Sequence, residues 1–201
     1  MGKVFVDAVV SVDGYVADGD DGVDPLFEWF ENGDVAVSFS DPDPDPDHVL
    51  HVSQASADYI TNEIGSVGAV VVGRRSFDLT NGWDGVPPTG DHMFVVTHEA
   101  PTDWPFPDAP FTFVTDGVAS AVEQAKVVAG ERSVSVSAGE IGGQALAAGV
   151  VDEVHMNVVP VVFGSGRRFF GSYDGGKLVL DDPRIIQGDR VVHTIYPVRK
   201  G

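Results

Sequence analysis

Two arginines stand where a buried strand is expected to end and a helix to begin. Residues 70–77 read Val-Val-Val-Gly-Arg-Arg-Ser-Phe, which places Gly73, Arg74, Arg75 and Ser76 at the junction. Free backbone amides at a helix start, together with two guanidinium groups, attract an anion such as a phosphate. The alternative is a pair of surface arginines that neutralises nearby aspartates, and the motif alone does not decide between the two.

The net charge makes this basic pair informative. The chain has 201 residues, of which 12 are basic and 31 acidic, and its formal net charge is −19. So acidic a surface repels nucleic acids and anionic membranes, and neither is expected as a partner. An anionic cofactor would require positive charge to be concentrated locally. Arg167-Arg168, after Gly164-Ser165-Gly166, is the other adjacent arginine pair.

Small residues gather at a second junction between a strand and a helix. Residues 134–146 read Val-Ser-Val-Ser-Ala-Gly-Glu-Ile-Gly-Gly-Gln-Ala-Leu, with Ala138, Gly139, Ile141 and Gly142 at the turn. A backbone without large side chains can approach a pyrophosphate closely. The spacing is not the Gly-x-Gly-x-x-Gly fingerprint of dinucleotide-binding folds, and it does not follow the first strand. By spacing alone, a tightly packed turn is the simpler interpretation.

A carboxylate follows the first expected strand, in the sequence Ser11-Val12-Asp13-Gly14. At this position it can hold the amino or hydroxyl groups of a substrate or relay a proton, although an Asp-Gly pair more often marks a turn. We therefore take Asp13 as the candidate catalytic residue. The six histidines match no zinc-binding pattern and the chain has no cysteine, so no metal site is expected.

The elements that must position these residues alternate between strand and helix. The apolar pattern predicts strands at residues 4–10, 69–73, 93–97, 111–114, 134–137 and 154–163, and helices at 25–30, 53–64, 118–128 and 141–148. Asp24 and Asp116 are expected as helix caps. Residues 178–180 and 191–198 are expected to close the fold as an antiparallel pair, with its turn at Gly188-Asp189. This pattern predicts an α/β fold with a mainly parallel sheet and helices on both faces.

Domain organisation, environment and assembly follow from the same pattern. No linker or repeat divides the chain, so residues 1–201 are expected to form one domain. The prolines among the aspartates of residues 41–47 predict an exposed acidic loop over about 36–50. The absence of a membrane span and of an export signal indicates the cytoplasm. The long apolar strands at 154–163 and 191–198 exceed the expected helical cover, which predicts a twofold homodimer.

Taken in order, these motifs resemble the dihydrofolate-reductase-like superfamily and, within it, the reductase domain of riboflavin biosynthesis. The matching stretches are residues 4–17, 70–77, 93–98 and 134–170. The last is the most specific, with a helix that stops at Gly149, then Val151-Asp152-Glu153, a long strand and a Gly-rich turn. Where family members often have a Gly-Gly pair, this chain has Ser137-Ala138. The zinc deaminase signature that accompanies the riboflavin enzymes is absent.

The resemblance implies a three-layer reductase that uses NADP(H). It places the NADP phosphates at residues 73–76, the adenosine ribose and its 2′-phosphate near Thr97 and His98, and the pyrophosphate at residues 138–142. Val10 and Ser11 would border the nicotinamide, and Asp13, Trp29 and Phe30 would face the substrate. The implied reaction is hydride transfer to a C=N or C=O bond of a small substrate, for example a pterin-like or pyrimidine-like ring. The alternative is a non-catalytic nucleotide-binding member of the same fold.

Overall fold

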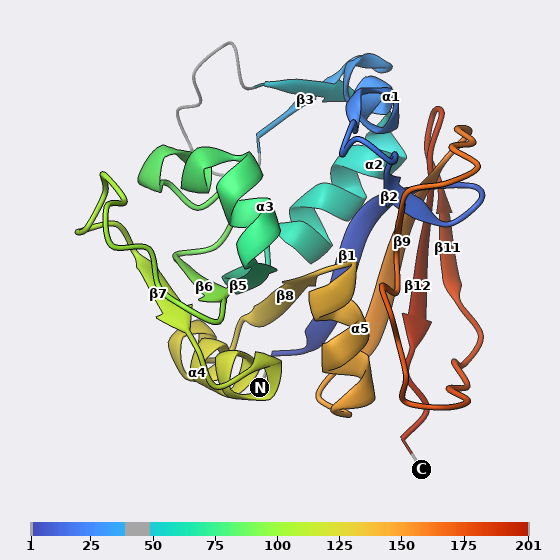
Figure 1. Cartoon of the computed structure of the whole chain (residues 1–201). Coiled ribbons are helices and arrows are strands. Elements are labelled where there is room, and N and C mark those ends of the chain that lie inside the picture. The colour runs from blue at the N-terminus through green and yellow to red at the C-terminus, as the bar shows by residue number, and fades with distance from the viewer. Residues whose placement is uncertain (1, 39–48, 201) are drawn as a thin grey trace.

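A single eight-stranded sheet runs through the molecule (Figure 1), in a computed structural model that describes residues 2–38 and 49–200. The strand order is β11-β12-β9-β1-β8-β5-β6-β7. Six of the strands are parallel: β1 (Val4–Ser11), β5 (Val67–Gly73), β6 (His92–Val96), β7 (Phe111–Val114), β8 (Ser133–Ser137) and β9 (Glu153–Val159). The last two, β11 (Arg184–Gln187) and β12 (Val192–Pro197), are antiparallel, which confirms the expected sheet.

The central strands are apolar because both of their faces are covered. Every residue of β5 except its last, Gly73, is buried. In β1, Val4, Val6 and Val10 pack in one core, whereas Phe5 lies in a second core on the opposite face of the sheet. Parallel strands that are buried on both faces read as continuous apolar runs, which explains why β1 and β5 were readily predicted.

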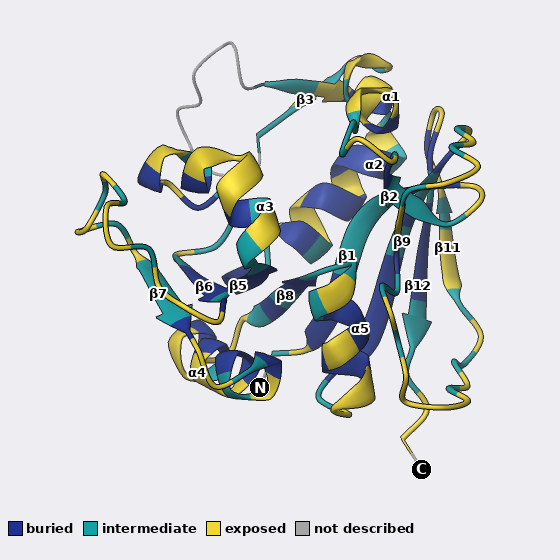
Figure 2. Cartoon of the chain, viewed as in Figure 1, coloured by how far each residue is buried: buried dark blue, intermediate teal, exposed yellow. Residues whose placement is uncertain are grey.

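Helices cover both faces, as predicted. One face is covered by α4 (Val118–Ala129) and α5 (Glu140–Ala147), and the other by α1 (Asp24–Phe27), α2 (Gln54–Tyr59) with its π-helical extension η3 (Ile60–Ile64), and α3 (Arg74–Leu79). Figure 2 shows buried residues on the sheet and on the inner sides of the helices. Among the described residues, no helix is long and apolar enough to cross a membrane.

Short elements complete the fold around this sheet. They are the 3-10 helix η1 (Glu28–Glu31), the helical segment η4 (Asn81–Gly85), and two small antiparallel pairs, β2 (Tyr15–Ala17) with β10 (Arg167–Arg168) and β3 (Val35–Val37) with β4 (Leu50–Val52). The pair β3–β4 corrects the expectation that all of residues 36–50 form a loop. The Asp-Pro run itself, with residues 39–48, lies outside the described residues.

Both expected helix caps are wrong. The residue before α1 is Val23, and Asp24 lies inside the first turn of the helix. The N-cap of α4 is Gly117, whose φ of 99° is a conformation that glycine adopts without strain. Asp116 precedes this turn by one residue too many to cap the helix.

The C-terminal strands also differ from the prediction. The strand expected to reach residue 163 ends at Val159, because Pro160 has no N–H to continue the ladder. The partner of β12 is β11 rather than residues 178–180, of which only Leu180 forms a bridge, to Val198. The expected turn is confirmed, with the Gly188 N–H donating to Val191 O (3.0 Å).

The segment between β10 and β11 covers sheet surface that the helices leave open. Phe170, Tyr173, Leu178 and Leu180 are partly buried against the core on the α5 side of the sheet. These side chains bury apolar area that the sequence assigned to a second copy of the chain. Part of the uncovered apolar surface on which the expected homodimer rested is therefore covered within the chain, and the homodimer stays a prediction.

Candidate active site

The carboxyl ends of three adjacent parallel strands meet at one edge of the sheet. β5 ends at Gly73, β6 at Val96 and β8 at Ser137, and these strands are neighbours in the order β8-β5-β6. Helix α3 begins directly after β5, and α5 begins at Glu140 on the opposite face. This edge is where open α/β sheets bind their ligands.

A cleft of about 540 Å³ lies at this edge. Six of the residues predicted to bind the cofactor line it: Gly73, Arg75, Ser76, Ala138, Gly139 and Ile141. Gly139 has a φ of 86°, which glycine tolerates, and it leads into the first turn of α5. The first-turn amides of a helix have no partner within the helix, so this end of α5 attracts an anion.

A second cleft, of about 430 Å³, adjoins the first through Ile141, which lines both. This second cleft is lined by Arg74, Thr97 and His98. The residues that the family resemblance assigns to the adenosine ribose of NADP therefore lie next to the cleft that it assigns to the pyrophosphate. Asp78 accepts from Arg74 Nε (2.7 Å) and the Glu99 carbonyl accepts from Arg74 Nη1 (2.9 Å), which fixes the guanidinium at the mouth of the cleft. Both clefts have volumes typical of ligand sites, and because they adjoin they can take two halves of one ligand.

Two of the residues predicted to bind the cofactor line neither cleft. Val10 is fully buried in the core on the α5 side of the sheet. Gly142 is buried in α5, and a Cβ built on it would lie 2.8 Å from Val6 Cγ1. Gly142 therefore lets α5 approach β1 closely, which is the packing interpretation of the small-residue turn.

Asp13 is held by a turn rather than pointing into either cleft. Its carboxylate accepts from Ser11 Oγ (2.6 Å) and from the backbone amides of Phe163 (3.2 Å) and Gly164 (2.7 Å). The Ser11 hydroxyl, followed by these amides, lowers the pKa of Asp13 from its ordinary value. Ser11 is itself buried and also accepts from the Tyr15 amide (2.9 Å). Asp13 does border a third, open hollow, which adjoins the first cleft through Arg168, Gly171 and Ser172.

The aromatic side chains predicted to face the substrate lie in the core. Trp29 is 3% exposed and packs on Phe30 with 4.4 Å between ring centroids, and its edge meets His193. Neither Trp29 nor Phe30 lines the two clefts. The roles of Ser11, Asp13, Trp29 and Phe30 toward a substrate therefore stay predictions, and none of the four lines either of the two clefts.

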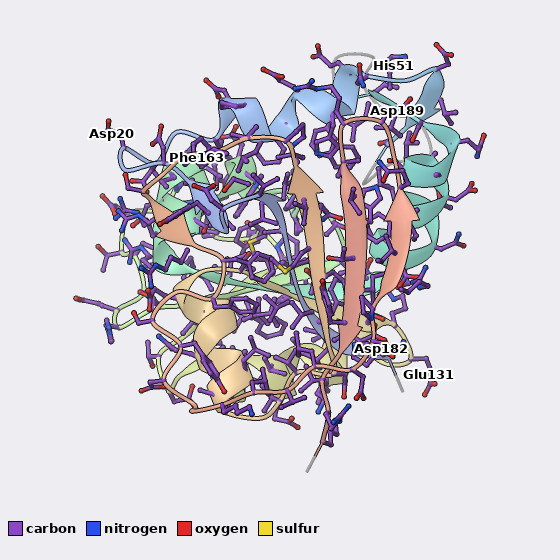
Figure 3. All side chains as sticks on the ribbon, turned by 90° about the vertical axis from the view of Figure 1, so that its right-hand side faces the viewer. Asp20, His51, Glu131, Phe163, Asp182 and Asp189 are labelled. Carbon is purple, nitrogen blue, oxygen red and sulfur yellow. The ribbon has the colours of Figure 1, made fainter. Side chains whose placement is uncertain are left out.

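Sequence reasoning missed several residues of the first cleft. Asp21, Arg167, Arg168 and Ser172 all line it. The pairing of β2 with β10 carries the two arginines there, and Figure 3 shows Asp20 and Phe163, from these two parts of the chain, at the same end of the molecule. In the sequence, the adjacent arginines Arg167 and Arg168 were the one signal for this part of the cleft. The pairing of β2 with β10 joins segments far apart in the sequence, and such a contact leaves no periodic pattern of residues.

Charge in the first cleft is balanced by close ion pairs. Arg75 Nε donates to Asp21 Oδ1 (3.2 Å) and its Nη2 contacts Asp21 Oδ2, while Arg167 Nε donates to Asp21 Oδ1 (2.9 Å). The Arg75 guanidinium first, and then that of Arg167, lowers the pKa of Asp21 to about 2. Ser172 Oγ lies 2.8 and 2.9 Å from the two carboxylate oxygens of Glu140. The cleft therefore presents fixed charges of both signs to a ligand.

The sheet order and the clefts at its carboxyl edge define the class of protein, a dihydrofolate-reductase-like α/β fold. Residues 2–193 match the family model of the RibD C-terminal domain, and the chain belongs to this family. The expected fold class and family are thereby confirmed. No curated protein is significantly similar to the chain in sequence.

Solved structures with the same fold include proteins of riboflavin biosynthesis. A putative riboflavin biosynthesis protein from Shewanella sp. PV-4 is 19% identical with a TM-score of 0.66, and the match covers 98% of this chain and 99% of that chain. The riboflavin biosynthesis reductase Rib7 of Saccharomyces cerevisiae is 13% identical, with a TM-score of 0.53 and coverage of 99% and 89%.

A longer protein shares the fold over part of its length. The Thermotoga maritima diaminohydroxyphosphoribosylaminopyrimidine deaminase/5-amino-6-(5-phosphoribosylamino)uracil reductase is 13% identical with a TM-score of 0.60. The match covers 98% of this chain but 57% of that protein. At these identities the likeness shows the fold.

Proposed function

We propose that this protein is an NADPH-dependent reductase that acts on a small molecule, with the two adjoining clefts as its dinucleotide site. One observation carries the proposal: nine of the residues implicated by the family resemblance line the two clefts, and Ile141 joins them. Family membership and the reductases that share the fold support the same reaction class. The substrate is proposed to offer a C=N or C=O bond, and a pyrimidine-like ring suits the family.

The chain's own residues supply binding and orientation. The first-turn amides of α5 and the Arg75 side of the first cleft would hold the pyrophosphate, and Arg74, Thr97 and His98 would hold the adenosine ribose with its 2′-phosphate. NADPH, when bound, supplies a hydride from its nicotinamide ring. Asp13 lies outside the clefts, so in this proposal it fixes the turn at Phe163-Gly164 instead of transferring a proton.

A fluorescence titration with NADPH and with NADH tests the cofactor assignment. The wild type should bind NADPH more tightly, and Arg74→Ala should weaken NADPH binding about 10- to 100-fold while leaving NADH nearly unchanged, as expected for one charged contact to a 2′-phosphate. Arg199→Ala is the matched control, because Arg199 pairs with Asp181 away from the clefts. Equal affinity of the wild type for both cofactors would contradict the proposal.

A non-catalytic nucleotide-binding protein is the second candidate. It is favoured by the position of Asp13, whose carboxylate is engaged by three hydrogen-bond donors and does not line the dinucleotide clefts. Oxidation of NADPH, followed by its absorbance with a panel of cyclic imines, pyrimidines and ketones, separates the two candidates. Turnover of any panel member favours the reductase, whereas saturable NADPH binding without turnover favours the second candidate.

A further inference from the structure

The arginines of this acidic chain are almost all neutralised by their own carboxylates. Seven of the eight contact an Asp or Glu side chain within the described residues: Arg74, Arg75, Arg132, Arg167, Arg184, Arg190 and Arg199. For Arg168, the described residues provide no such partner. Arg168 lines the first cleft beside Arg75 and Arg167, so this cleft gathers three guanidinium groups in a protein with a net charge of −19.

One carboxylate neutralises two of these three groups. Asp21 accepts from Arg75 Nε at 3.2 Å and from Arg167 Nε at 2.9 Å, and Arg75 Nη2 contacts its second oxygen. The side chain of Asp21 is 13% exposed, whereas those of Arg75 and Arg167 are 59% and 48% exposed. The carboxylate is thus enclosed by two guanidinium groups whose remaining donors face the cleft and solvent.

The backbone around Asp21 is shaped to present this carboxylate. Asp21 has a φ of 66°, a left-handed conformation that non-glycine residues rarely adopt and that Asp and Asn tolerate best. Asp18 closes the loop on itself, since its Oδ1 accepts from the amides of Asp20 (2.8 Å) and Gly22 (2.7 Å). The Asp18–Gly22 loop therefore holds Asp21 toward the two arginines.

Two guanidinium groups that converge on one oxyanion form a favourable phosphate site. In this structure the oxyanion is supplied by the chain. The arginines reach it from different parts of the fold, Arg75 from the first turn of α3 and Arg167 from β10. Glu140, the other acid of the cleft, is bound by Ser172, and within the described residues no arginine makes such a contact with it.

We infer that Asp21 is an internal competitor for anionic ligands: its carboxylate occupies the Arg75–Arg167 pair, the position that a ligand's phosphate or pyrophosphate group takes when it binds in the first cleft. The inference rests on the proposed function, which assigns this cleft to a dinucleotide. Binding of the anion displaces Asp21, and the Asp18–Gly22 loop moves away from α3 and β10. Asp21 thereby lowers the affinity of the cleft for phosphates.

Titration calorimetry with inorganic pyrophosphate tests this inference on the whole chain. Asp21→Asn keeps the size and the left-handed conformation but removes the charge, and it should bind pyrophosphate about tenfold more tightly than the wild type. Adding Arg167→Ala to Asp21→Asn should abolish the gain. Asp20→Asn is the matched control, because it removes the same charge one residue away and should change the affinity less than twofold.

A second measurement follows the loop itself in the wild type. Hydrogen exchange of the Gly22 amide, which donates to Asp18, should accelerate when pyrophosphate binds if the loop is displaced. Unchanged pyrophosphate affinity in Asp21→Asn, or an equal gain in Asp20→Asn, would overturn the inference. Unchanged affinity in Asp21→Asn would mean that the ion pairs of Asp21 have only a structural role. An equal gain in Asp20→Asn would mean that any loss of negative charge near the cleft has the same effect.

The outcomes separate this inference from the proposed function. If wild-type protein binds NADPH but Asp21→Asn shows no gain for pyrophosphate, the inference fails and the proposed function stands. If NADPH does not bind to any variant but Asp21→Asn gains affinity for pyrophosphate, the competitor role stands and the dinucleotide assignment fails.

Discussion

Two polar networks in this protein shift the pKa of an aspartate in opposite directions. The first network lies on the α2 side of the sheet. There Ser56 Oγ donates to His193 Nε2 (2.9 Å) and His193 Nδ1 donates to Asn157 Oδ1 (2.7 Å). Asn157 Nδ2 in turn donates to Asp7 Oδ1 (3.0 Å). Because the Asn157 amide donates to Asp7, its oxygen faces His193, which places the imidazole proton on Nδ1. At the edge of the sheet, Asp21 is instead enclosed by Arg75 and Arg167.

Burial governs the first network and charge governs the second. Burial raises the pKa of Asp7 to about 6 and lowers the pKa of His193 to about 4, so each is driven toward its neutral form. The two guanidinium groups lower the pKa of Asp21 to about 2 and keep it ionised. The comparison teaches that the buried network stabilises the fold, whereas the cleft network holds charge where a ligand can compete for it.

The largest expected effect is on stability, at the centre of the buried network. Asn157→Ala removes the hydrogen bonds that Asn157 makes to Asp7 and to His193 Nδ1, and should lower the free energy of unfolding by about 2–4 kcal/mol in urea denaturation at pH 7. Arg74→Ala, in the exposed cleft, is the comparison and should change it by less than about 1 kcal/mol. Equal losses in the two variants would remove the distinction between the networks.

The pH dependence of stability should come from the buried network. The raised pKa of Asp7 favours folding below about pH 4, and this contribution is lost as the pH rises through about 6. The lowered pKa of His193 favours folding above about pH 6.5, and this contribution is lost as the pH falls through about 4. Each is worth at most about 3 kcal/mol, and in the wild type they oppose each other between pH 4 and 6.

Single variants should expose these opposed contributions. Relative to the wild type, Asp7→Asn should gain stability as the pH rises from 4 to 6.5, because only the His193 contribution remains. His193→Gln should lose stability over pH 4 to 6, because only that of Asp7 remains. Chemical denaturation across this range measures both slopes, and parallel curves for all three proteins would show that neither group is perturbed by burial.

A smaller effect is expected where α5 meets the segment after β10. A Cβ on Gly143 would lie 2.2 Å from the Phe170 carbonyl oxygen, so Gly143→Ala should cost about 1–3 kcal/mol by forcing the two backbones apart. It should also weaken NADPH binding, because Gly139 and Ile141 at the start of α5 line the clefts. Gln144→Ala is an exposed control for stability on the same helix, because Gln144 lines the second cleft but makes no such close approach, and thermal unfolding of both variants decides whether the close approach matters.

The smallest stability change should follow from removing the charge of Asp21. Ion pairs with half-exposed arginines contribute little to stability, so Asp21→Asn should shift the free energy of unfolding by less than about 1 kcal/mol. A loss of several kcal/mol by urea denaturation would instead place Asp21 among the residues that hold the fold together. Urea denaturation of Asp21→Asn and Asn157→Ala side by side therefore gives the clearest contrast in the free energy of unfolding.

The parts of the site that are local in sequence could be predicted. Gly73 to Ser76 and Ala138 to Ile141 each lie within one strand–helix junction, and the end of a parallel strand fixes the edge of the sheet at which a junction lies. The sheet itself was predictable because β1 and β5 are mainly apolar. These residues needed no knowledge of long-range contacts.

The rest depended on contacts between distant segments. Asp21 reaches Arg75 and Arg167 across 54 and 146 residues, and the pairing of β2 with β10 that brings them together involves strands too short to show a pattern. The family resemblance implies that Trp29 faces the substrate, but its ring packs against His193 of β12. In Ser11-x-Asp13-Gly14, a catalytic acid and a turn share the same sequence. The Gly14 N–H donates to Ser11 O (2.9 Å), which shows the turn, and the catalytic role of Asp13 stays a prediction.

The most direct test of the dinucleotide site is to map NADPH binding by NMR on the wild-type protein. Addition of NADPH should shift the amide resonances of residues 73–76, 97–98 and 139–141, which line the clefts, while those of Ser56, Asn157 and His193 behind the sheet stay in place. Shifts confined to the buried network or to other surfaces, or no shifts at saturating NADPH, would contradict the account.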